Sequence, residues 1–126
     1  MKKRILVIDD EEILTKTFSR LLQKQGYEVA VATRGEDALR LAESQAFDLA
    51  LCDVRMPGLS GVETVRQIQG RRVGRSQTPI PVIFLTGFAD KMLEMQAQQL
   101  KPAAYVYKPF DALQLLELIQ QNLAKA

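Results

Sequence analysis

Four short apolar segments of this sequence each end in a polar side chain that could take part in chemistry. The groups are an acid pair, a lone acid, a hydroxyl and an ammonium. Carboxylates that lie close together repel, at a cost of about 4 kcal/mol for two unit charges 4 Å apart at an effective dielectric constant of about 20. A divalent cation would relieve that repulsion. The residues that carry these groups are Asp9 and Asp10, Asp53, Thr86 and Lys108.

The residue types indicate phosphoryl chemistry supported by a metal ion. The sequence contains no histidine, so a metal at this place would be held by oxygen atoms. Such ligands suit Mg²⁺ (or Mn²⁺), which keeps several waters and accepts a phosphate oxygen. Asp53 could act as a carboxylate nucleophile toward phosphorus. Lys108 would neutralise phosphoryl charge, and the Thr86 hydroxyl would donate to a phosphoryl oxygen.

Each of these residues also has an ordinary interpretation. Acids after a strand often begin a helix, where the helix dipole favours them by ~0.3–1 kcal/mol each, and we assign Glu11 and Glu12 to that role. A lone threonine or aspartate is usually a turn or cap residue, and a lone lysine is usually solvated. Their occurrence at four strand ends favours a single site, provided that the second strand, which ends near Thr33, lies at an edge of the sheet.

Strand-like and helix-like patterns alternate five times along the chain. Short apolar runs predict buried strands, and apolar residues three and four apart predict the helices between them. This alternation predicts a doubly wound parallel sheet with helices on both faces, whose strand ends share one edge. The predicted strands are residues 5–8, 28–32, 49–52, 81–85 and 104–106, and the predicted helices are 13–25, 33–42, 62–69, 89–100 and 111–123. Thr33 with Glu36, Ser60 with Glu63, and Asp111 with Gln114 have the spacing of helix-starting capping boxes.

Length and composition indicate one globular domain over residues 1–126. The net charge of +2 is too small to indicate binding to nucleic acid or to an anionic membrane. The single cysteine, Cys52, lies in an apolar run, which is typical of a buried, unreactive thiol. The apolar run behind the basic start is too short for a signal peptide or a membrane span, so we expect a cytoplasmic protein.

The four strand-end segments are ILVIDDE at residues 5–11, DVRMPGLSG at 53–61, FLTG at 84–87 and YVYKPF at 105–110. Taken together, these motifs resemble the receiver domain of two-component response regulators, and the resemblance covers the whole chain. It implies a flavodoxin-like, three-layer α/β/α fold of five βα units with strand order 2-1-3-4-5, an order for which a receiver is a standard example. It also implies a phosphoacceptor that is not an enzyme with an external substrate, and no effector domain within this chain.

The resemblance implies a phosphorelay role for the predicted site. Asp53 would accept a phosphoryl group from a phosphohistidine of a sensor histidine kinase or histidine phosphotransfer protein. Lys108 and Thr86 would bind the phosphoryl oxygens. The metal would be held by Asp10, Asp53 and the backbone carbonyl of Arg55, and through water by Asp9.

The resemblance also implies a switch. Tyr105 matches the family's switch aromatic, which turns inward when Thr86 moves toward the phosphoryl group. The surface formed by the helix over 89–100, the strand over 104–106 and the final helix would then change its partner preference, with a phosphorylation-dependent dimer as one outcome. From the residues alone, Tyr105 is equally well explained as a half-buried strand aromatic.

Some features depart from the family pattern or have two interpretations. The connector over residues 70–79 is long and basic, and we expect a solvated loop rather than a docking element. Met92 and Met95 are expected to pack inward, with an adaptable docking surface as the alternative. Leu113 is expected on the apolar face of the final helix. Phe88 is expected to hinder the water that would attack a phosphorylated aspartate and so to lengthen the phosphorylated lifetime.

Three other classes of protein share parts of this pattern. A phosphohydrolase of the haloacid dehalogenase type places a second aspartate two residues after its nucleophile, where this chain has Arg55. A flavin carrier needs a hydroxyl- and glycine-rich loop after the first strand, where this chain has four acids that would repel a phosphate. A receiver-like binding module that works without phosphorylation remains the alternative, although the full set of acid, hydroxyl and ammonium groups argues against it.

Overall fold

The computed structural model describes residues 2–87 and 90–124 as one parallel sheet flanked by helices. The strands are β1 (Arg4–Ile8), β2 (Glu28–Ala32), β3 (Leu49–Asp53), β4 (Val82–Thr86) and β5 (Ala104–Tyr107). The helices are α1 (Glu12–Lys24), α2 (Gly35–Ser44), α3 (Gly61–Gly74), α4 (Lys91–Gln99) and α5 (Ala112–Ala124). The strand order is β2-β1-β3-β4-β5. The predicted flavodoxin-like fold with order 2-1-3-4-5 is therefore confirmed.

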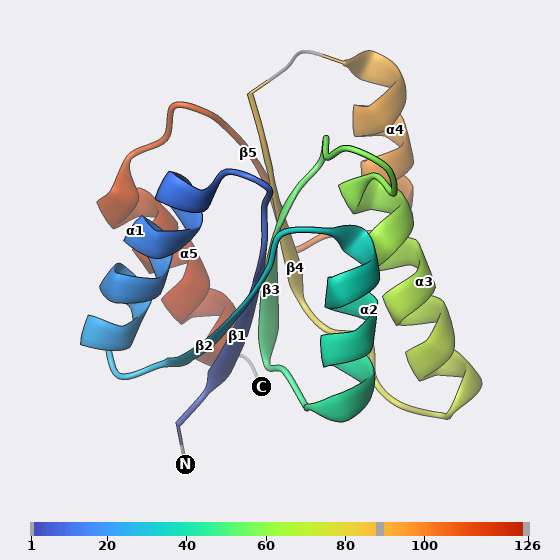
Figure 1. Ribbon diagram of the computed structural model, residues 1–126, viewed down its shortest axis with the longest axis horizontal. Coiled ribbons are helices and arrows are strands. Elements are labelled where there is room, and N and C mark those ends of the chain that lie inside the picture. The colour runs from blue at the N-terminus through green and yellow to red at the C-terminus, as the bar shows by residue number, and fades with distance from the viewer. Residues whose placement is uncertain (1, 88–89, 125–126) are drawn as a thin grey trace.

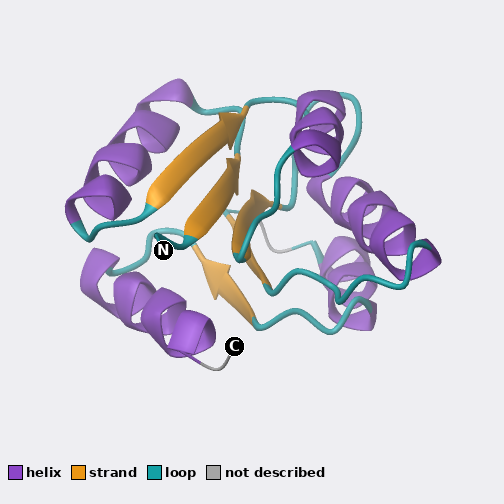
Figure 2. Cartoon of the chain, turned by 90° about the horizontal axis from the view of Figure 1, so that it is seen from below, coloured by secondary structure: helices purple, strands orange, loops and turns teal. Residues whose placement is uncertain are grey.

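The sheet lies between two layers of helices. Helices α1 and α5 cover one face, and α2, α3 and α4 cover the other (Figure 1). Figure 2 shows the same three layers from below, with the strands between the two groups of helices. No helix within the described ranges is long and apolar enough to cross a lipid bilayer.

Each strand contributes to two separate cores because successive side chains point to opposite faces of a sheet. Every residue of β3 and β4 is buried, as is typical of strands covered on both faces. The core under α2, α3 and α4 includes Leu6, Ile8, Cys52, Val65 and Phe84. The core under α1 and α5 includes Ile5, Val7, Phe18, Leu51, Leu85 and Ile119.

Two of the three predicted helix starts are found. The Ser60 hydroxyl accepts a hydrogen bond from the Glu63 N–H at 3.1 Å, and the Asp111 carboxylate accepts one from the Leu113 N–H at 2.8 Å. The predicted start at Thr33 is wrong, because α2 begins at Gly35 without a side-chain cap. Gly35 lies closely against α3, since a Cβ at this position would be 2.4 Å from the Thr64 hydroxyl oxygen.

The prediction of a connector over residues 70–79 is wrong for its first half, because α3 continues to Gly74. Arg71 and Arg75 lie one turn apart and both bind the carboxylate of Glu43 on α2, at 3.0 and 2.7 Å. The Arg72 Nε donates to the carbonyl of Thr78 at 2.6 Å. These contacts hold the basic segment in a helix that local glycine content argues against.

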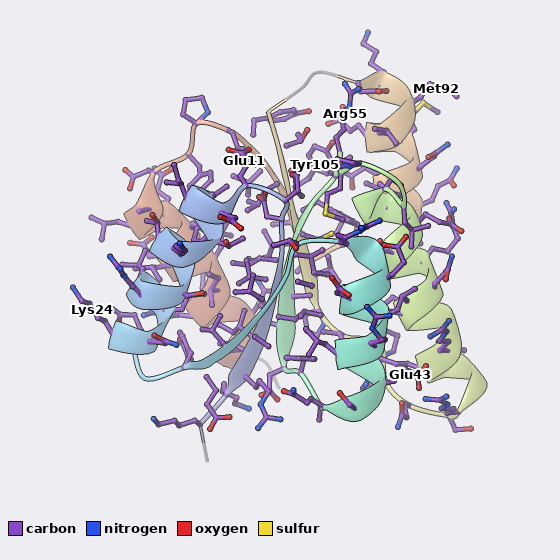
Figure 3. The ribbon with its side chains drawn as sticks, viewed as in Figure 1. Glu11, Lys24, Glu43, Arg55, Met92 and Tyr105 are labelled. Atoms are coloured by element: carbon purple, nitrogen blue, oxygen red, sulfur yellow. The ribbon has the colours of Figure 1, made fainter. Side chains whose placement is uncertain are left out.

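Several apolar side chains point outward where the sequence pattern predicted burial. Leu113 is 71% exposed, whereas Leu115, two positions further along α5, is buried. Met92 and Met95 are 70% and 63% exposed, so the expectation that they pack inward is wrong. Figure 3 shows Met92 on the outer side of α4. These methionines lie on the helix that precedes β5, which is where an adaptable docking surface was the alternative.

Candidate functional site

The predicted site residues come together at the carboxyl edge of the sheet. Asp53 is the last residue of β3, and Thr86 is the last residue of β4. Asp9 follows β1, and its N–H donates to the Ala32 carbonyl at 3.0 Å. Lys108 follows β5, and its N–H donates to the Thr86 carbonyl at 2.7 Å. The parallel register therefore aligns four strand ends, with β2 at the edge as the sequence argument required.

Three carboxylates form a compact cluster at this edge. One oxygen from each of Asp9, Asp10 and Asp53 lies within 4.8 Å of the other two. Asp9 and Asp53 are 1% and 6% exposed, whereas Asp10 is exposed. The N–H of Glu11 donates to Asp9 Oδ1 at 3.0 Å, and the N–H of Arg55 donates to Asp53 Oδ1 at 3.3 Å. The backbone thus orients both buried acids and places Arg55 directly beside the Asp53 carboxylate.

Lys108 is the cation that faces this cluster. Its Nζ lies 3.3 Å from Asp9 Oδ2, 3.4 Å from Glu11 Oε1 and 3.7 Å from Asp53 Oδ2. The lysine side chain is 17% exposed. Its one positive charge therefore faces several carboxylates, and the cluster keeps an excess of negative charge.

The pKa values reflect this excess. The pKa of Asp53 is raised from 3.8 to about 6, mainly by burial and also by the charge of Asp9, while the charge of Lys108 opposes the change. Burial also raises the pKa of Asp9, although the hydrogen bond from the Glu11 N–H and the charge of Lys108 lower it. Burial works against the charged form of Lys108, but Asp53, Asp9 and Glu11 together outweigh it and raise the pKa of that ammonium. A cluster of acids that resist ionisation is chemically suited to a bound cation.

The donor set fits a hard divalent cation. The three carboxylates offer oxygen atoms at close range, and the exposed Asp10 leaves one side of the cluster open to water and to a ligand. An open groove of about 410 Å³ adjoins that side. Its lining residues are Asp10, Glu12, Thr33, Arg34, Pro57 and Gly58.

Thr86 and Tyr105 are linked by a side-chain hydrogen bond. Thr86 is 1% exposed, and Tyr105 is half-buried. The Tyr105 ring lies against Phe84, with centroids 6.2 Å apart, and meets Tyr107 edge-on at 5.5 Å. The Tyr107 hydroxyl in turn donates to the carboxylate of Glu94 on α4. Tyr105 is therefore the half-buried strand aromatic expected from the residues alone, and it also reaches the site through Thr86.

One contact that the sequence patterns do not predict comes from Glu11. Glu11, assigned to a helix start, also reaches Lys108, a residue 97 positions away. Cys52 is fully buried as predicted, and burial raises the pKa of its thiol well above the ordinary value, with the charges of Asp53 and Asp9 adding to the effect. Phe88 lies outside the described residues, as does Ala89, the predicted start of the fourth helix.

The fold and the acidic site define the class of protein, and comparison with known proteins agrees. Residues 5–120 match the family described as the response regulator receiver domain. The chain therefore belongs to the response regulator receiver domain family. Members of this family are signalling modules rather than classical enzymes. The acid cluster is of the kind that receivers use as a metal site.

Individual relatives include both sequences and solved structures. The chain is 34% identical to the transcriptional regulatory protein ZraR of Salmonella typhimurium and 31% identical to the transcriptional regulatory protein PdtaR of Mycobacterium tuberculosis. These matches cover 95% and 98% of this chain but only 26% and 58% of the relatives. The chain thus spans from about a quarter to just over half of the length of these curated relatives.

Two solved structures are similar to this chain over most of its length. A CheY-like receiver domain protein from Methanospirillum hungatei superposes with a TM-score of 0.90 at 30% identity, covering 99% of this chain and 96% of that one. A response regulator from Burkholderia pseudomallei, solved with a phosphorylated aspartic acid, a calcium ion and citrate, has a TM-score of 0.80 at 28% identity. That match covers 98% of this chain and 70% of the Burkholderia chain.

Proposed function

We propose that this chain works as a phosphoacceptor in a two-component phosphorelay, with Asp53 as the acceptor. The observation that supports this most directly is the placement of the Asp53 carboxylate, which is within 4.8 Å of two other acids and 3.7 Å from the Lys108 ammonium. The phosphoryl donor is a phosphohistidine on a sensor histidine kinase or a histidine phosphotransfer protein. The phosphorylated aspartic acid in the Burkholderia structure shows the same chemistry in a relative.

The proposed reaction is a single displacement at phosphorus. An Asp53 carboxylate oxygen forms the new bond to phosphorus as the bond from phosphorus to the histidine nitrogen breaks, and the bonding electrons leave with the imidazole. The Lys108 ammonium neutralises charge on the phosphoryl oxygens, and the Thr86 hydroxyl donates a hydrogen bond to one of them.

The acid cluster would hold the metal that the family implies. Asp10, Asp53 and the backbone carbonyl of Arg55 would bind Mg²⁺ (or Mn²⁺) directly, with Asp9 acting through water. When bound, this ion supplies positive charge that draws the phosphoryl oxygens toward the acids. The Arg55 N–H and the Lys108 ammonium meanwhile help to orient the Asp53 side chain.

The proposed response passes through Thr86 and Tyr105. A phosphoryl group on Asp53 would compete for the Thr86 hydroxyl, which now shares a hydrogen bond with Tyr105. The Tyr105 side chain would then turn inward, and the surface formed by α4, β5 and α5 would change its preference for a partner or a second copy of the chain. Met92 and Met95 lie exposed on this surface. A cytoplasmic location follows from the same proposal, because the kinase would deliver the phosphoryl group there.

Intact mass measurement after incubation with an acyl phosphate and Mg²⁺ tests the proposal. We expect one phosphoryl adduct on the unmodified chain, none on Asp53→Asn, and an unchanged adduct on Asp37→Asn, which removes a partly exposed acid on α2. An adduct that persists in Asp53→Asn would contradict the assignment of the acceptor. No adduct at saturating Mg²⁺ would favour the alternative function, a receiver-like binding module that works without phosphorylation.

A further inference from the structure

The Lys108 ammonium is shared among three carboxylates and is not paired with Asp53 alone. Its Nζ lies closer to Asp9 Oδ2 at 3.3 Å and to Glu11 Oε1 at 3.4 Å than to Asp53 Oδ2 at 3.7 Å. Asp9 is buried at the base of the site, whereas the Glu11 side chain is 63% exposed at its rim. Figure 3 shows Glu11 at the start of α1, on the same edge of the sheet as Arg55 and Tyr105.

The backbone at Glu11 favours this contact. Glu11 occupies the N-cap position of α1, yet its side chain makes no capping hydrogen bond. Its N–H is held by Asp9 Oδ1 at 3.0 Å, so the residue is fixed beside the site while its carboxylate remains available. The side chain therefore faces Lys108 instead of closing the first turn of the helix.

We propose that Glu11 is a positioning residue that restrains Lys108 and thereby slows phosphoryl transfer to Asp53. This inference rests on the function proposed above. A phosphoryl group carries between one and two negative charges near neutral pH, and Lys108 must turn toward it. Glu11 opposes that movement by holding the ammonium, and its own charge repels the incoming group. Both effects act in the same direction.

The size of the effect is limited by solvent. An ion pair with one exposed partner is weakened by water and by salt. We therefore expect removal of the Glu11 charge to speed phosphorylation by about two- to fivefold. The difference should shrink as the ionic strength rises, because the contact lies at the rim of the site.

The test compares Glu11→Gln with Glu12→Gln in the full chain at saturating Mg²⁺. Both variants remove one negative charge at the start of α1, but no contact joins Glu12 to Lys108 among the ion pairs of the described residues. The measured quantity is the initial rate of adduct formation from an acyl phosphate, followed by intact mass. Glu11→Gln should be about two- to fivefold faster than Glu12→Gln, with the gap closing in high salt.

A second measurement reports the position of Lys108 directly. The Cε–Hε NMR signal of Lys108 in the metal-free protein, assigned with Lys108→Arg, should move in Glu11→Gln and stay in place in Glu12→Gln. This readout does not depend on phosphorylation or on the metal. It separates a restraint on the ammonium from a general change in charge near the site.

The outcomes distinguish this inference from the function on which it rests. Equal rates in the two variants, or a Lys108 NMR signal that does not move in Glu11→Gln, would overturn the inference and leave Asp53 as the acceptor. An unmodified chain that never forms the adduct would overturn the proposed function, and this inference with it. A faster Glu11→Gln together with a shifted Lys108 signal would support both.

Discussion

Gly61 begins α3 directly against the backbone of Asp53. A Cβ on Gly61 would lie 1.8 Å from the carbonyl oxygen of Asp53 and 2.9 Å from the sulfur of Cys52. The Gly61 N–H donates to the Val54 carbonyl at 2.9 Å, which closes the loop that carries Arg55. The acceptor strand and the helix after it therefore approach so closely that only glycine fits at their contact.

We expect Gly61→Ala to be strongly destabilising. The methyl group would meet a backbone carbonyl that cannot rotate away, so α3 must shift, at a cost of roughly 3 kcal/mol or more. Gly70→Ala is the matched control within the same helix, because nothing lies within 4 Å of its added Cβ. That variant should gain about 0.5–1 kcal/mol from improved helix propensity. Urea unfolding of the two variants measures both values, and equal stability would contradict the close approach.

The raised pKa of Asp53 predicts how stability depends on pH in the metal-free protein. The folded chain holds the Asp53 proton more tightly, with a pKa of about 6 against an ordinary 3.8. The contribution of this group is therefore fully favourable below about pH 4 and is lost as the pH rises through about 6. Asp53→Asn should be more stable than the unmodified chain by about 3 kcal/mol at pH 7.5. That advantage should vanish near pH 4, as followed by urea unfolding in EDTA.

Binding of Mg²⁺ should offset the repulsion among the three acids. A ligand that binds only the folded state at ten times its dissociation constant adds about 1.4 kcal/mol to stability. We expect millimolar Mg²⁺ to raise the melting temperature at pH 7.5, and this rise should be lost in Asp10→Asn. Glu36→Gln on α2, outside the cluster, should respond as the unmodified chain does. An equal rise in all three proteins would indicate a general salt effect.

Tyr105→Phe isolates the hydrogen bond to Thr86 because it keeps the ring and removes the hydroxyl. We expect a loss of about 0.5–1.5 kcal/mol, the usual net contribution of such a bond. Tyr107→Phe, which removes the hydrogen bond to Glu94 at an exposed position, should cost less. Thermal unfolding gives both values. A larger loss in Tyr107→Phe would place the more important contact on α4 rather than at the site.

Glu43 should hold the last turn of α3. It binds Arg71 and Arg75, and the Arg75 hydrogen bond is the main reason that its pKa is lowered. In Glu43→Gln we expect amide hydrogen exchange over residues 71–75 to become several-fold faster. Asp37→Asn is the control, since it removes an ion pair with Arg40 that is confined to α2. Unchanged exchange in Glu43→Gln would mean that the helix end is held by Arg72 and Thr78.

The alternation of apolar runs and helical spacings was sufficient to predict the sheet, its helices and the edge where the polar residues gather. The carboxyl ends of parallel strands share one edge of the sheet, so the meeting of Asp9, Asp53, Thr86 and Lys108 could be predicted once the second strand was placed at the sheet edge, as the family resemblance implied. The helix cap at Ser60 could also be predicted from the sequence, because it depends on residues only three positions apart.

Only the tertiary structure decided the features that join distant parts of the chain. Gly35 at the start of α2 packs closely against Thr64 of α3, and Glu43 of α2 binds Arg71 and Arg75 at the end of α3. The sharing of Lys108 between Asp9 and Glu11 arises from residues about a hundred positions apart. Such contacts follow from how packed elements meet in space, which local propensity and periodicity do not encode.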